Sequence, residues 1–212
     1  MATCEAVIFD LGRVLIDYDW HIALKGLQKW TRMSEEEAER RILAMDGVFR
    51  FETGKLDERA FHAHVEEAVQ AKIPFPDFEV LWDSIFTGEI ERVARVARAI
   101  MADGRVKLAV LSNTNAMHVR FLRRTWPLMN QLTNVFLSNE IGYRKPDPSA
   151  FQHVLDRIGT KAEATLMVDD LERNIQAAKA LGMLTLHVTS LEQAVKELAT
   201  YGLVADGKGT QG

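Results

Sequence analysis

The segment that most constrains the fold is VIFDLGRVLI, from Val7 to Ile16. Residues 6–9 are continuously apolar, which predicts a buried strand of a parallel sheet. Asp10 interrupts this run and stands at the carboxyl end of the strand, the edge where open α/β sheets bind ligands. Asp is also common in turns after strands, so this position alone does not assign it a role.

The second half of the chain repeats a rhythm of strands and helices. Short apolar stretches at 106–111, 134–137, 164–168 and 183–188 predict strands, and the amphipathic stretches between them predict helices. This alternation implies right-handed crossovers and a parallel sheet covered on both faces, with all carboxyl ends at one edge. The polar residues at those ends are Asp10, Ser112, Asn113, Ser138, Asp169 and Asp170.

The stretch after the first strand has a different pattern. Its periodicity predicts four amphipathic helices, one opened by Ser34 and Glu37 and one capped by Asp57, with a loop at 49–55 and no strand. We therefore expect an α/β protein with a three-layer, parallel-sheet, Rossmann-like core and a helical insertion. The expected division is a core of residues 1–16 and 87–205, a helical insertion of residues 17–86 and a flexible tail of residues 206–212.

Composition narrows the partners. The net charge of -4 argues against nucleic acid, because phosphate backbones require clustered Lys and Arg. Cys4 is the one cysteine, so no internal disulfide can form, and this fits a reducing compartment. No apolar run approaches the ~18 residues of a membrane span, and no signal peptide precedes the first strand. We expect a cytoplasmic protein, a monomer or homodimer that binds neither membrane nor nucleic acid.

The strand ends carry residues suited to binding phosphate and metal. Asp10 and Asp170 repel each other unless a cation lies between them, and Mg²⁺ prefers carboxylates, water and substrate phosphate. Ser112 and Asn113 lead into a helix whose amides form an anion site, and Lys145 lies in a proline-stiffened loop. Each of these residues also has an ordinary alternative, as a helix cap or as a solvated surface lysine.

Four motifs, in this order, resemble the signature of the haloacid dehalogenase-like (HAD) superfamily. They are FDLG at 9–12, LSNTN at 111–115, RKPD at 144–147 and VDDLERN at 168–174. The resemblance covers all but the last few residues. The residues of these motifs are most similar to those of bacterial sugar-phosphate phosphatases acting on glucose 1-phosphate and of the phosphatase domain of soluble epoxide hydrolases.

The resemblance implies an Mg²⁺-dependent phosphatase of small phosphorylated metabolites, sugar phosphates first among them. Asp10 would be the nucleophile and form an aspartyl phosphate, and Lys145 would orient Asp10 and share its charge. Mg²⁺ would be held by Asp10, the backbone carbonyl of Gly12 and Asp170. Asp169 would lie next to these ligands without contacting the metal.

The resemblance also assigns the substrate contacts. Ser112 and the backbone amide of Asn113 would bind the phosphoryl oxygens, and Asn174 would orient the Asp170 loop. The insertion would act as a mobile cap, and its loop at 51–55 would reach over the site. Its aromatic residues Trp20, Phe49 and Phe51 either line a substrate pocket or belong to the core of the insertion.

Two positions depart from the family pattern. Most phosphatases of the superfamily carry a general acid two positions after the nucleophile, where this chain has Gly12. General acid–base help is worth ~10²–10⁴-fold, so we expect slower turnover, a better leaving group or a substitute acid. Arg13 stands where Asn is usual. The candidate substitutes are Asp17, Asp19, His21, His62 and His64.

Two other functions remain open at this stage. A haloacid dehalogenase also uses an Asp nucleophile without the second acid, but it attacks carbon and needs no metal. The Asp169-Asp170 pair argues against it, because uncompensated carboxylates hinder an anionic substrate. A phosphate-ester-binding protein that has lost catalysis is the third possibility, and the retained Asp10, Lys145 and Asp170 argue against it.

Overall fold

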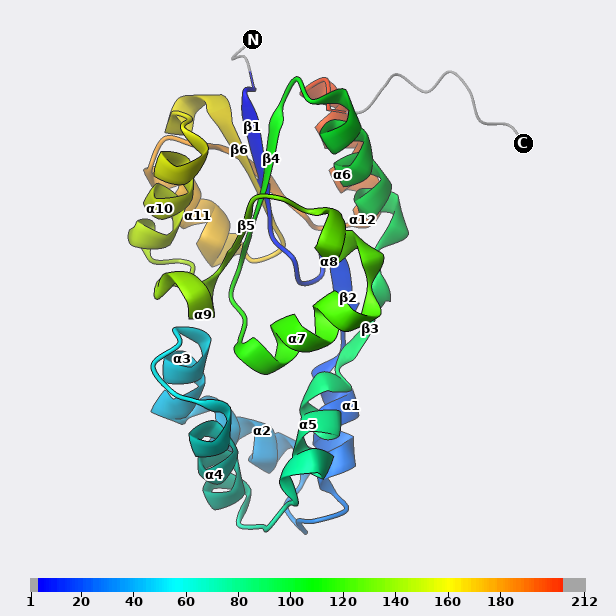
Figure 1. Ribbon diagram of the computed structural model, residues 1–212, viewed down its shortest axis with the longest axis vertical. Helices are drawn as coiled ribbons and strands as arrows, with labels where there is room; N and C mark the ends of the chain where they lie inside the picture. Colours follow the sequence, from blue (N-terminus) through cyan, green and yellow to red (C-terminus); the bar gives the residue numbers. More distant parts are fainter. Residues whose placement is uncertain (1–3, 204–212) are drawn as a thin grey trace, which may run out of the picture.

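A five-stranded parallel sheet forms the centre of the computed structural model, which describes residues 4–203 (Figure 1). Its strand order is β5-β4-β1-β6-β7, so β1, the strand that ends at Phe9, is central. Phe9 pairs with Val110 on one side and Val168 on the other. The strands are β1 (Ala6–Phe9), β4 (Lys107–Ser112), β5 (Val135–Leu137), β6 (Thr165–Asp169) and β7 (Leu184–His187). The predicted three-layer α/β fold is confirmed.

Helices cover both faces of this sheet, and alternate side chains of β1 point to each face. Val7 and Phe9 belong to one hydrophobic cluster, and Ala6 and Ile8 belong to another. The first face carries α6 (Glu91–Asp103), α7 (Ala116–Thr125), α8 (Pro127–Gln131) and α12 (Leu191–Thr200). The second carries α10 (Pro148–Ile158) and α11 (Glu172–Ala180), with the short α9 (Ser138–Ile141) and η1 (Ala162–Ala164) nearby.

Five helices form a separate lobe, in the lower part of Figure 1. This helical lobe has its own hydrophobic cluster, centred on the stacked rings of Phe51 and Phe61. Its helices are α1 (Trp20–Leu27), α2 (Glu35–Leu43), α3 (Asp46–Glu52), α4 (Glu58–Val69) and α5 (Phe75–Asp83). Ser34 and Asp57 cap α2 and α4 as the sequence predicts.

Three expectations for this region were wrong. β2 (Ile16–Tyr18) and β3 (Phe86–Glu89) form a two-stranded antiparallel sheet where no strand was expected, because such short strands show no periodicity. α3 occupies most of the predicted loop at 49–55 and has no side-chain cap that would mark its start. The prolines at 74 and 76 predict a break before a helix at 78–86, but α5 begins at Phe75 and takes Pro76 into its first turn, where proline is tolerated.

Two further predictions concern membrane spans and the C-terminal tail. Within residues 4–203, no helix has both the length and the apolarity needed to cross a membrane. The flexible tail expected at 206–212 lies outside the described residues.

Candidate active site

Three aspartates meet at the carboxyl edge of the sheet. Asp10 follows β1, Asp169 ends β6, and Asp170 comes directly after it. Carboxylate oxygens from all three lie within 4.8 Å of one another. The predicted convergence of these strand ends is therefore present, and it concentrates negative charge at one point.

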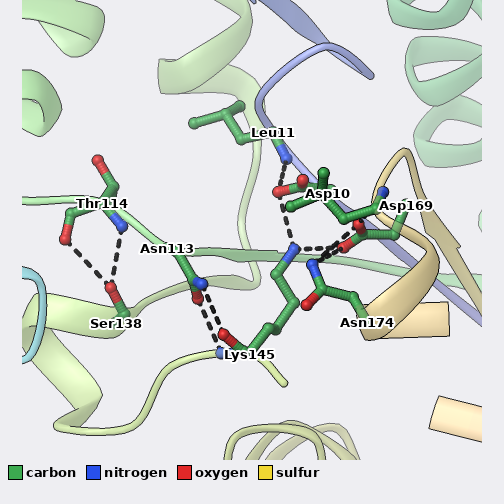
Figure 2. Close-up of polar contacts among 9 residues, drawn as sticks. Asp10, Leu11, Asn113, Thr114, Ser138, Lys145, Asp169 and Asn174 are labelled. Atoms are coloured by element: carbon green, nitrogen blue, oxygen red, sulfur yellow. Dashed lines mark hydrogen bonds and ion pairs between the residues drawn. The ribbon is translucent and has the colours of Figure 1, made fainter. Parts of the chain in front are cut away.

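Lys145 lies between two of these carboxylates (Figure 2). Its side chain is 1% exposed, and its Nζ lies 2.9 Å from Oδ1 of Asp10 and 2.6 Å from Oδ2 of Asp169. The side chain of Asn113 fixes the lysine backbone: its Nδ2 donates to Lys145 O and its Oδ1 accepts from Lys145 N, both at 2.8 Å. Sequence analysis predicted a role only for the Asn113 backbone amide and missed this side-chain clamp.

Asp169 is saturated with hydrogen bonds. It is fully buried and accepts from Lys145, from Asn174 Nδ2 and from the backbone N–H of Leu171. Asn174 therefore contacts Asp169, the residue directly before Asp170. Both carboxylate oxygens of Asp169 already accept hydrogen bonds. Asp10 and Asp170 are therefore the carboxylates that can still bind a cation.

The pKa values of Asp10, Asp170 and Lys145 are shifted by burial and by neighbouring charges. Burial raises the pKa of Asp10 to about 7, against the opposing effect of Lys145. Burial also raises the pKa of Asp170, with the charge of Asp169 adding to the effect. For Lys145, burial alone would lower the pKa, but Asp10 and Asp169 outweigh it and the pKa is raised.

The donor set fits a hard divalent cation. Three carboxylates face one buried lysine, so the cluster carries excess negative charge when ionised. The turn after Asp10 is closed by hydrogen bonds from Arg13 N to Ile16 O and from Ile16 N to Leu11 O. Neither bond uses the carbonyl of Gly12, which is the oxygen that the sequence assigns to the metal.

Tyr18 fills the space beside Gly12. A Cβ atom built on Gly12 would lie 2.7 Å from Cε1 of Tyr18, too close for any other residue without movement of the ring. Arg13 adopts a positive φ of 55° and places its guanidinium over the Tyr18 ring, 5.2 Å from the centroid. The position of the usual general acid is thus occupied by an aromatic ring from β2.

A cavity of about 520 Å³ opens between the sheet edge and the helical lobe. Its core side includes all the predicted site residues, and Trp20, Phe49 and Phe51 line its lobe side. The five candidate substitute acids are not among the lining residues. Asp19 instead caps α1, and His62 bonds the carbonyl of Ile73.

The helical lobe touches the core beside this cavity. Oε2 of Glu52, on α3, lies 2.9 Å from NH1 of Arg144, which immediately precedes Lys145. Burial raises the pKa of Glu52, and Arg144 opposes the shift. Gly54 has a φ of 69°, and a Cβ there would lie 2.3 Å from the backbone oxygen of Asn139. The sequence offered no signal for either contact, because both partners are remote along the chain.

Comparison with known proteins decides the family. Residues 4–182 match the haloacid dehalogenase-like hydrolases. The chain belongs to this family. The resemblance carried by the four motifs is therefore confirmed.

Individual relatives span the chain nearly end to end. The sesquiterpene phosphatase astK of Aspergillus oryzae is 30% identical over 204 residues, 92% of this chain and 95% of its own length. Phosphatase MT3486 of Mycobacterium tuberculosis is 27% identical, with 97% and 98% covered. A HAD family enzyme of Bacteroides thetaiotaomicron, solved with magnesium and inorganic phosphate, has a TM-score of 0.73 and 21% identity. It covers 86% of this HAD-like chain and 93% of its own.

Proposed function

We propose that this HAD-like hydrolase is a phosphatase that hydrolyses small phosphate monoesters with Mg²⁺. The observation that carries the proposal is Lys145, held between Asp10 and Asp169 by the Asn113 clamp. This arrangement orients one carboxylate toward the cavity while its charge is partly offset. The relatives named as phosphatases support the same reaction.

The proposed reaction has two steps. The carboxylate of Asp10 attacks phosphorus, the bond to the alcohol oxygen breaks, and an aspartyl phosphate forms on Asp10. Water then hydrolyses this acyl phosphate and regenerates the carboxylate. Lys145 holds Oδ1 of Asp10 in place throughout, so the other oxygen is the nucleophile. Ser112 and the backbone amide of Asn113, which line the cavity, bind the phosphoryl oxygens.

The cation would be held by Asp10, the carbonyl of Gly12 and Asp170. When bound, Mg²⁺ would offset the repulsion between the anionic nucleophile and the anionic substrate and stabilise the equatorial phosphoryl oxygens. Asp169 would act through Lys145 and Asn174, which already occupy its oxygens.

We further propose that residues 17–86 act as a cap over a catalytic core of residues 1–16 and 87–205. The contacts of Glu52 with Arg144 and of Gly54 with Asn139 support this division, because they join the two parts at the rim of the site. The alcohol part of the substrate has two candidate classes. The motifs resemble those of sugar-phosphate phosphatases, whereas one relative is named for a sesquiterpene substrate.

An aryl phosphate assay tests the proposal. Wild type should release para-nitrophenolate from para-nitrophenyl phosphate with Mg²⁺ and not with EDTA, because this leaving group needs no general acid. Asp10→Asn should abolish turnover, while Asp17→Asn, which alters an exposed carboxylate outside the cavity lining, should retain it. Metal-independent release of chloride from chloroacetate, without phosphatase activity, would instead establish a dehalogenase. Saturable binding without turnover would indicate a non-catalytic protein.

A further inference from the structure

We infer that the alcohol released by this enzyme is apolar: the cavity is built to hold an alkyl, isoprenoid or aryl group rather than a sugar. This inference rests on the proposed phosphatase function and names the substrate class of the same site. It departs from the sugar phosphates suggested by the motifs, because those motifs lie on the core side and bind phosphate.

The lobe side of the cavity is lined mainly by hydrocarbon. Aliphatic and aromatic side chains from every helix of the lobe face it. Partly or fully accessible ones run from the end of α2 through α3, where a substrate leaving the sheet edge would extend, and Trp20 on α1 is another. Those of α2 and α3 are Leu43, Met45, Val48 and Phe49.

Exposed apolar surface concentrates at this cavity. Six large hydrophobic residues are exposed in the described part of the chain, and three of them, Leu43, Phe49 and Leu171, line the cavity. Leu43 is 68% exposed and Phe49 is 45% exposed, although both could have been polar without cost to the lobe's core. Apolar surface that converges on one cavity marks a binding site, and it is removed from water when an apolar ligand enters.

Polar side chains on the lobe side are few and partly engaged. Glu52 pairs with Arg144. His118, on α7 of the core, faces the lobe with both ring nitrogens bonded, to Asn115 and to the carbonyl of Trp82. Burial lowers the pKa of His118 to about 4, so its ring is neutral. Apart from Glu39, Glu52 and the polar tips of aromatic rings, the lobe offers a sugar little with which to replace the water on its hydroxyls. Burying those hydroxyls unpaired would oppose binding.

A series of para-alkylphenyl phosphates isolates the apolar contact, because leaving-group acidity is nearly constant across it. We expect kcat/KM to rise from phenyl through para-ethyl and para-butyl to para-hexylphenyl phosphate. The rise should approach fourfold per buried methylene, the equivalent of ~0.8 kcal/mol, until the cavity is filled. A para-hydroxyethyl group should give a lower kcat/KM than the propyl group of similar size, and glucose 1-phosphate should be a poor substrate.

Matched variants locate the effect. Leu43→Glu should lower the ratio of hexylphenyl to phenyl phosphate turnover by about tenfold, because it places a charge on the apolar wall. Val80→Glu is the control. Val80 is 73% exposed on α5, outside the cavity lining, so the same change there should leave the ratio unaltered. Because both side chains are exposed, both variants should fold like the wild type.

The result separates this inference from the proposed function. Mg²⁺-dependent turnover with a flat series, or with a sugar phosphate preferred, would overturn the apolar substrate and leave the phosphatase intact. If no ester is hydrolysed, binding of the same esters tests whether the cavity prefers an apolar group. Quenching of Trp20 and Trp82 fluorescence in Asp10→Asn should report tighter binding with each added methylene. Chain-length-independent binding would overturn the inference.

Discussion

Replacement of Lys145 by methionine is the most informative single change in the site. The side chain is 1% exposed and lies between Asp10 and Asp169, whose carboxylate oxygens approach within 4.8 Å. Two like charges at that distance repel by about 3 kcal/mol at an effective dielectric constant of about 20. Methionine fills most of the lysine volume, so this repulsion and the lost ion pairs dominate. We expect Lys145→Met to lower the free energy of unfolding by about 3–5 kcal/mol.

Urea unfolding in EDTA measures this effect. At pH 8 Asp10 of the wild type is ionised and paired with Lys145, because its pKa is about 7, so the deficit of the variant should be full. The deficit should shrink toward pH 5, because Asp10 is protonated there in both proteins and the repulsion is absent. Lys107→Met is the matched control. Lys107 is exposed and donates to the carbonyls of Ile158 and Gly159, so its loss should cost about 1 kcal/mol or less at either pH.

Two results would refute the reasoning. A deficit below about 1 kcal/mol at pH 8 would show that Lys145 does not compensate the carboxylates. A deficit independent of pH would assign the loss to packing. Addition of Mg²⁺ should restore part of the stability of Lys145→Met, because a second cation enters the same cluster.

Three further changes test other contacts. Gly12→Asp should lower the free energy of unfolding by about 1–3 kcal/mol without raising turnover, because its Cβ would lie 2.7 Å from Tyr18. The double variant Gly12→Asp with Tyr18→Ala should recover stability in thermal melts. Gly54→Val should lower kcat/KM with little change in the unfolding of the core, since the side chain would meet the backbone of Asn139 and hold the lobe away. The stability of Asp83→Asn relative to wild type should be greater at pH 8 than at pH 5. Burial raises the pKa of Asp83 to about 7, so the protonated side chain stabilises the wild type at low pH. This stability is fully present below about pH 4 and is lost as the pH rises through 7, by roughly 2 kcal/mol.

Each of these changes has an outcome that contradicts it. Wild-type stability in Gly12→Asp would mean that Tyr18 moves freely. Undiminished kcat/KM in Gly54→Val would show that contact between the lobe and the core is not needed for turnover. For Asp83→Asn, a stability difference that does not change between pH 5 and pH 8 would show that Asp83 is ionised in both conditions.

The position of the site was predictable because it depends on short-range patterns. An apolar run ending in Asp10 predicts a buried strand with a carboxylate at its end, and each later strand could be recognised in the same way. Parallel pairing then brings the strand ends together without further information. The convergence of Asp10, Asp169 and Asp170 follows from this topology.

The partners within the site were not predictable in the same way. The side chain of Asn113 bonds the backbone of Lys145, which is 32 residues further along the chain, so no local pattern indicates this contact. Asn174 closely follows both Asp169 and Asp170 along the chain, so sequence separation alone does not choose its partner. β2 and β3 have three and four residues, too few for periodicity to indicate a strand.

The missing acid at position 12 and the apolar cavity are physically connected. Glycine there leaves room for the Tyr18 ring, which could not lie 2.7 Å from a Cβ atom. The ring gives the cavity an aromatic surface beside Gly12, and Trp20 and Leu24 are further apolar lining residues. A second carboxylate at position 12 would bring charge to a surface otherwise suited to hydrocarbon. The lack of general acid help and the proposed binding of an apolar alcohol are therefore both compatible with the same glycine.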